Sequence, residues 1–157
     1  MQIVTFVEKA IDMKTPEKQE IPYTISEEVP QHLNESEVLY WIQSKNINWN
    51  YLGAIKQLSS FNDETISEWL NISVRTFRSY KESTEKISNN LKEQVLLLVA
   101  LLKHGNAVFG SKQDFGKWLS TPNFFFDNHM PANYLTSITG IRFIEDRLTA
   151  LEFGDNI

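Results

Sequence analysis

The stretch 88–104 constrains the fold most, because it is apolar almost all the way round a helix. Leu91, Val95, Leu98 and Leu102 recur at helical spacing, and most residues between Leu96 and Leu102 are also Leu, Val or Ala. A helix of this kind is stable only when other elements cover it. The stretch therefore predicts a long buried helix in an all-α protein, joining two helical parts. Half of a dimer interface is a second, compatible use of its surface.

Upstream, residues 61–80 have the pattern of two short helices joined by a tight turn. Asn62 and Ser73 are suitable N-caps, and Asn71 tolerates the left-handed backbone conformation that such a turn requires. Apolar residues stand where two steeply crossed helices need them, at Ile66, Leu70, Ile72, Phe77 and Tyr80. We therefore predict a helix-turn-helix within a DNA-binding domain over residues 33–104.

The second of these helices carries the candidate DNA contacts. The whole chain has a net charge of −5, which argues against indiscriminate nucleic-acid binding, but residues 71–104 hold six basic and three acidic side chains. A dimer would place two recognition helices about one DNA turn apart. The alternative is that Arg75 and Arg78 form an ordinary solvent-exposed helix face. The predicted DNA-binding residues are Ser73, Arg75, Thr76, Arg78, Ser79 and Lys81.

Residues 105–157 contain the caps and stops of several short helices. Ser111 is a predicted N-cap, Pro122 ends the helix that follows, and Pro131 suits the first position of another. The consecutive aromatics 124–126 cannot all point inward from a short loop, so at least one is a candidate contact.

The last helix is predicted from Ile141, because apolar residues recur there at steps of three and four. Thr139 is its predicted N-cap, and Gly154 is its predicted left-handed C-cap. Together with the short helices before it, this helix predicts a small compact module.

Several segments of this module resemble the C-terminal toxin-binding domain shared by antitoxins of the Xre, MbcA and ParS type. The resemblance is carried, in order, by Ala107-Val108-Phe109-Gly110, Trp118-Leu119, Pro122-Asn123, Pro131-Ala132-Asn133-Tyr134-Leu135, Thr139-Gly140 and Leu148 through Gly154. Ser73 through Arg78 also resembles the recognition helix of that family, so the likeness covers roughly residues 45–155.

The resemblance implies a cytoplasmic antitoxin of a type II toxin–antitoxin system that inhibits its toxin and represses its own operon. The commonest partner in this family is a RES-domain toxin that degrades NAD, held inactive when the antitoxin's C-terminal segment obstructs the active-site cleft. NAD would then be the toxin's substrate and no cofactor of this chain. We expect the toxin contacts on the exposed side of the last helix and its tail, at Phe143, Arg147, Glu152, Phe153, Gly154 and Asp155.

Two other functions stay open from the sequence. A stand-alone transcriptional regulator would use its C-terminal half to dimerise or to sense a ligand. A toxin-binding module that has lost DNA binding would keep only the second surface. An enzyme is not expected, because no nucleophile, phosphate-binding or metal-binding motif is present and cysteine is absent.

The remaining expectations concern the N-terminus and the histidines. Residues 1–32 are predicted to be a flexible arm, kept extended by Pro22 and Pro30. No membrane-spanning or signal segment is predicted. His32, His104 and His129 are far apart in sequence, and His104 is explained by a helix end just before Gly105, where a cationic side chain is favoured.

Overall fold

The structure, a computed structural model, describes residues 22–82 and 87–154, and over these ranges the chain is all-α, as predicted. No strand occurs within them. The elements are α2 (Pro22–Glu28), α3 (Glu35–Ser44), α4 (Trp49–Leu58), α5 (Asp63–Trp69), α6 (Val74–Ser79), α7 (Asn89–Phe109), α8 (Lys112–Leu119), the 3-10 helices η1 (Phe124–Phe126) and η2 (Pro131–Tyr134), and α9 (Ile138–Glu152).

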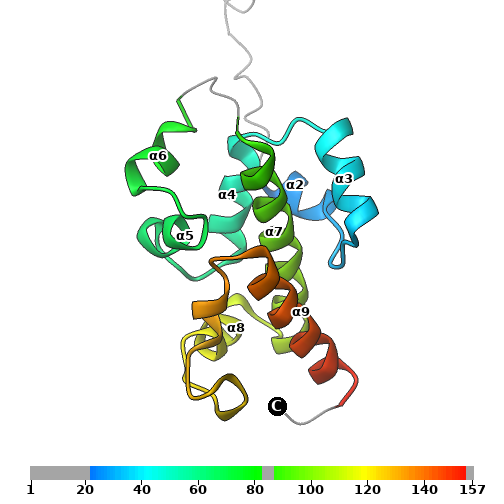
Figure 1. Cartoon of the computed structure of the whole chain (residues 1–157), viewed down its shortest axis with the longest axis vertical. Coiled ribbons are helices and arrows are strands. Elements are labelled where there is room, and N and C mark those ends of the chain that lie inside the picture. Colours follow the sequence, from blue (N-terminus) through cyan, green and yellow to red (C-terminus); the bar gives the residue numbers. More distant parts are fainter. Residues whose placement is uncertain (1–21, 83–86, 155–157) are drawn as a thin grey trace, which may run out of the picture.

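The long helix α7 runs through the middle of the molecule (Figure 1). Helices α3 to α6 lie around its first half, and α8 and α9 lie beside its second half. Every residue from Gln94 to Leu102 is buried. The predicted buried helix is confirmed, and it connects the two parts of the fold.

Helix α7 is 21 residues long and continues past Gly105, so the prediction that it ends there is wrong. It ends at Gly110, which has φ 86° and supplies the left-handed C-cap. Gly105 serves packing instead, since a Cβ there would lie 2.2 Å from Cε1 of Phe115 on α8. The predicted domain boundary between residues 104 and 105 therefore falls inside a continuous helix.

Residues 22–32 are an integral part of the fold, and the prediction of an extended arm is wrong for them. Helix α2 begins at Pro22, a position where the missing N–H would be unbonded in any residue, and it packs against α4. Val29 and Leu33 are buried. Lys103 donates a hydrogen bond to the Val29 carbonyl, and Arg142 donates one to the Leu33 carbonyl. Residues 1–21 lie outside the described residues.

Local cap signals were mostly predicted correctly. Asn62, Ser73 and Ser111 each accept the backbone N–H bond expected of an N-cap. The predicted cap of α9 is wrong: Ser137, not Thr139, accepts from the backbone N–H of Gly140. Helix α9 consequently begins at Ile138, earlier than predicted.

Within the described residues, no single helix is both long and apolar enough to cross a membrane. Helices α7 and α8 together are long and apolar enough, but their axes are bent by 105° relative to each other.

Candidate partner-binding surfaces

Helices α5 and α6 are joined by the tight turn expected from the sequence. Asn71 has φ 55°. Its backbone N–H donates to the carbonyl of Glu68, and the N–H of Ile72 donates to that of Ser67, both at 3.1 Å. These bonds are those of a Schellman motif, which closes the end of α5 and turns the chain into α6. The Asn71 side chain also donates to the Thr136 carbonyl at 2.7 Å, which ties the turn to the C-terminal part.

Of the predicted DNA-binding residues, Ser73, Arg75, Arg78 and Lys81 are exposed, and Thr76 and Ser79 are partly buried. The three hydroxyl residues are used within their own helix. Ser73 accepts from the Thr76 backbone N–H and contacts the Thr76 hydroxyl, and Ser79 donates to the Thr76 carbonyl. These three hydroxyl groups therefore form hydrogen bonds that stabilise the short helix α6.

Arg78 is exposed but ion-paired to the preceding helix. Its Nε lies 3.0 Å from Oδ2 of Asp63, and its terminal nitrogen lies 3.3 Å from Glu64. Lys56 contacts the other oxygen of Asp63 at 2.8 Å. Hydrogen bonds from Lys56 and Arg78 hold the pKa of Asp63 below its usual range, despite the opposing effect of burial. Acidic side chains of α5 therefore offset part of the positive charge predicted for this face.

The C-terminal part exposes aromatic side chains around Arg147. Phe124 is 81% exposed and Phe125 is 45% exposed, whereas Phe126 is buried. The guanidinium of Arg147 lies 6.0 Å from the ring centroid of Phe125 and 5.6 Å from that of Phe143. We call Phe124, Phe125, Phe143 and Arg147 the aromatic cluster. It joins η1 to α9.

The loop that carries the two exposed rings is closed by its own hydrogen bonds. The Asn123 side chain caps η1 by accepting from the Phe125 N–H at 3.0 Å. Asn123 and His129 form an isolated antiparallel bridge, and Asp127 and Asn128 between them have positive φ. The loop therefore fixes Phe124 and Phe125 at the surface while Phe126 enters the core.

The predicted toxin-binding residues fall into separate groups. Phe143 and Arg147 belong to the aromatic cluster. Phe153 is 81% exposed just after α9, and Gly154 has the predicted positive φ, 90°. Glu152 instead points towards α7, where its Oε2 lies 2.9 Å from Nε2 of His104. Asp155 lies outside the described residues.

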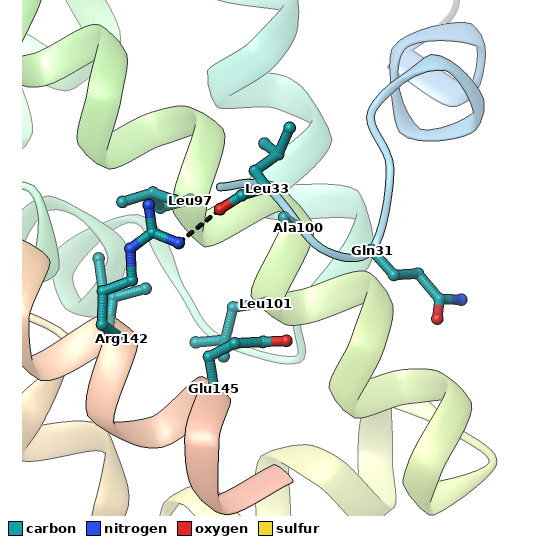
Figure 2. A pocket seen from close by; sticks show the side chains of 8 residues that line it. Gln31, Leu33, Leu97, Ala100, Leu101, Arg142 and Glu145 are labelled. Atoms are coloured by element: carbon teal, nitrogen blue, oxygen red, sulfur yellow. Dashed lines mark hydrogen bonds between the residues drawn. The ribbon is translucent and has the colours of Figure 1, made fainter. Parts of the chain in front are cut away.

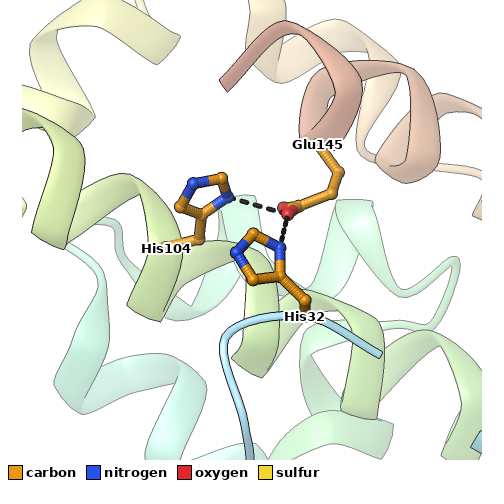
Figure 3. A group of neighbouring side chains, drawn as sticks. All are labelled: His32, His104 and Glu145. Carbon is orange, nitrogen blue, oxygen red and sulfur yellow. Dashed lines mark hydrogen bonds and ion pairs between the residues drawn. The ribbon is translucent and has the colours of Figure 1, made fainter. Parts of the chain in front are cut away.

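His104 is completely buried at the junction of α7, α9 and the segment before α3 (Figure 3). Its Nδ1 lies 2.7 Å from Oε1 of Glu145, and Nδ1 of His32 lies 2.7 Å from the same oxygen. Burial raises the pKa of Glu145, and the two histidines act in the opposite direction. The helix-end explanation of His104 is therefore wrong. His32 and Glu145 are 113 residues apart, so no local sequence motif predicts that His32, His104 and Glu145 meet.

Beside Glu145 there is a small cavity of about 10 Å³, lined by Leu33, Leu97, Leu101 and Arg142 among others (Figure 2). A single water molecule needs roughly this much space. The cavity is too small for an organic ligand, so it offers no substrate or cofactor site.

One part of the chain matches a known protein family. Residues 104–154 match the family model described as the antitoxin Xre/MbcA/ParS C-terminal toxin-binding domain. No curated protein matches the chain. The matched range runs from the last turns of α7 to Gly154 and contains the whole aromatic cluster, whereas α5 and α6 lie outside it.

Proposed function

We propose that this chain is the antitoxin of a type II toxin–antitoxin system and that its aromatic cluster binds the cognate toxin. The match of residues 104–154 to a toxin-binding domain supports the antitoxin role. The observation that carries the assignment of the surface is the exposure of Phe124 and Phe125 on a loop closed by its own hydrogen bonds.

The chemistry of the cluster suits a protein partner. Aromatic and arginine side chains dominate the binding energy of protein interfaces, because they bury large areas and lose little conformational freedom. Arg147 already lies against the rings of Phe125 and Phe143, so binding needs little further ordering of these side chains. The partner surface should be apolar opposite the two phenylalanines and acidic opposite Arg147.

The partner we propose is a RES-domain, NAD-degrading toxin, on the strength of the family resemblance. Phe153 and the residues after it would enter the cleft of that enzyme and exclude its substrate. The exposure of Phe153 at the end of α9, followed by the left-handed Gly154, supports this route.

The test is co-expression with the product of the adjacent gene, reading growth and cellular NAD. The variant Phe124→Ser, Phe125→Ser should lose neutralisation because both exposed rings are removed. Leu39→Ser, Tyr40→Ser is the matched control, since these α3 side chains are also exposed apolar residues but lie outside the matched range. Equal neutralisation by both double variants would contradict the proposed surface.

The proposal includes autorepression by a homodimer that binds operator DNA through α6. Exposed Arg75 and Lys81 support it. Arg78 would have to exchange Asp63 and Glu64 for phosphate or base contacts. We expect Arg75→Ala to weaken operator binding more than Arg78→Ala does, and to reduce its dependence on salt concentration. Binding that is unchanged in Arg75→Ala would contradict this assignment.

A toxin-binding module without DNA binding is the second candidate. The pairing of Arg78 with two carboxylates of α5 favours it, because those acids oppose the approach of phosphates. A titration of wild-type protein with its own promoter fragment distinguishes the two. Salt-dependent, sequence-specific binding supports autorepression, and its absence supports the second candidate.

A further inference from the structure

We propose that His32, His104 and Glu145 form a binding site for a divalent transition-metal ion, with Zn²⁺ as the best-fitting ion. The three potential ligand atoms all lie within 4.8 Å of one another. They come from the segment before α3, from α7 and from α9, and both imidazole rings turn a nitrogen towards the Glu145 carboxylate (Figure 3). Two imidazoles and one carboxylate are a ligand set that zinc accepts in proteins. No sequence motif predicts this site, because its residues are far apart along the chain.

The pattern of contacts around Glu145 is the first argument. Both Nδ1 atoms approach Oε1 at 2.7 Å, while Oε2 is buried and has no hydrogen-bond partner. If protons alone held the group together, both imidazoles would donate to one oxygen and leave the other bare. An ion between the nitrogens and the carboxylate accounts for two imidazole nitrogens that meet at one oxygen, because each nitrogen then directs a lone pair at the metal instead of a proton at the same oxygen.

The two nitrogen–oxygen distances permit this with small movements. Zinc–nitrogen and zinc–oxygen bonds of about 2.0–2.1 Å at a tetrahedral centre separate the ligand atoms by about 3.3 Å. The present nitrogen–oxygen distances of 2.7 Å must therefore open by roughly half an ångström. His32 supplies the freedom, because its side chain is 56% exposed.

The other nitrogen of His104 is the second argument. Nε2 lies 2.9 Å from Oε2 of Glu152. A ligand histidine in a protein metal site usually donates its second ring N–H to a carboxylate, which fixes the ring and leaves the first nitrogen free to coordinate. Glu152 meets this requirement for a histidine that is itself completely buried and so fixed in orientation.

The site would have three protein ligands and one open position on the side of exposed His32. A water molecule or a partner's side chain would complete a tetrahedron there. A bound ion would also link the segment before α3 to α9, which Arg142 already links through the Leu33 carbonyl. The inference concerns this junction alone and is independent of the proposed toxin partner.

The test uses the full-length chain without a histidine tag, stripped of metal with a chelator and then titrated with Zn²⁺ and with Co²⁺. We expect one equivalent to bind, and Co²⁺ to give the intense visible absorption of a tetrahedral site. At free Zn²⁺ a hundred times the dissociation constant, the folding equilibrium constant should rise about 100-fold, seen as a higher Tm.

Three variants make the result specific. His32→Gln should lose stoichiometric binding and the Tm shift, and its exposed position keeps the fold intact. Glu152→Gln should weaken binding by about 10- to 100-fold, as for other carboxylates behind a ligand histidine. His129→Gln is the matched control, because His129 is exposed and lies in the loop after η1, outside this group. Absence of stoichiometric binding by the wild type, or equal binding by His32→Gln and His129→Gln, overturns the proposal.

Discussion

Replacing Gly105 by alanine tests the packing of α8 against α7, on which the toxin-binding module rests. The added Cβ would lie 2.2 Å from Cε1 of Phe115, whereas non-bonded carbon atoms approach to about 3.5 Å. The Phe115 ring is buried and stacks on Phe109 at 5.6 Å and on Trp118 at 6.0 Å. Because the ring is buried and packed against these two neighbours, we expect the methyl group to push α8 away from α7.

The expected loss is the difference between two terms. Overfilling a packed core costs about 1–3 kcal/mol, and a Cβ 2.2 Å from a buried ring carbon puts this site at the upper end, about 2–3 kcal/mol. Alanine in place of glycine within a helix returns about 0.5–1 kcal/mol. We expect the free energy of unfolding to fall by about 1–2.5 kcal/mol, which lowers Tm by about 2–10 °C for a chain of this size. Urea and thermal unfolding measure both quantities.

The control is Gly110→Ala, which has φ 86° and no neighbouring atom within 4 Å of an added Cβ. It should also destabilise, by about 1–2 kcal/mol, but through backbone strain alone. In a Phe115→Leu background, the cost of Gly105→Ala should shrink and that of Gly110→Ala should not. A Gly105→Ala protein as stable as the wild type, or costs that add within about 0.5 kcal/mol, would refute the packing argument.

Two further substitutions test the links between elements. Asp63→Asn should lower the free energy of unfolding at neutral pH. The folded-state pKa of Asp63 lies below its ordinary value of 3.8, so the charged carboxylate stabilises the fold above pH 3.8. That stabilisation is lost as the pH falls through the folded-state pKa. Urea unfolding near pH 7 and near pH 3 would show this, and a pH-independent difference between the two proteins would contradict it. Gln94→Leu should lower the free energy of unfolding by about 1–3 kcal/mol, because the buried amide of Gln94 donates to the carbonyls of Trp69 and Leu135. An unchanged urea midpoint would show that these bonds contribute nothing net.

The features that could be predicted from the sequence are those determined by neighbouring residues. An N-cap needs a hydroxyl or amide within three positions of the N–H that it accepts, so Asn62, Ser73 and Ser111 were identified correctly. The left-handed Asn71 followed in the same way from the turn it had to make. The buried helix followed from its uniform apolar composition.

The features that were missed depend on contacts between distant segments. Gly105 looked like a helix end, because a sequence does not show that the ring of Phe115 will occupy the space beside it. His104 looked like a helix-end cation for the same reason, although it is paired with Glu145 and Glu152. Leu39 is apolar and adjoins the buried Val38 on α3, yet it is 59% exposed, which the sequence around it does not indicate.

In the candidate surfaces, too, residues on one helix were predicted and contacts between helices were missed. Phe143 and Arg147 were chosen from the outer side of the last helix, and the structure brings them together with Phe125. The acids that pair with Arg78 were missed, because they precede it by 14 and 15 residues on another helix. The charge of a recognition surface therefore depends on which helix lies beside it as much as on its own residues.

Hydrogen exchange of the chain, alone and in complex with the purified product of the adjacent gene, tests the central claim most directly. The aromatic cluster predicts slower amide exchange on binding within residues 124–126 and 143–153, with residues 63–79 unchanged. Slower exchange confined to residues 63–79 or to α3, with no change in η1 and α9, would contradict a toxin-binding role for this surface.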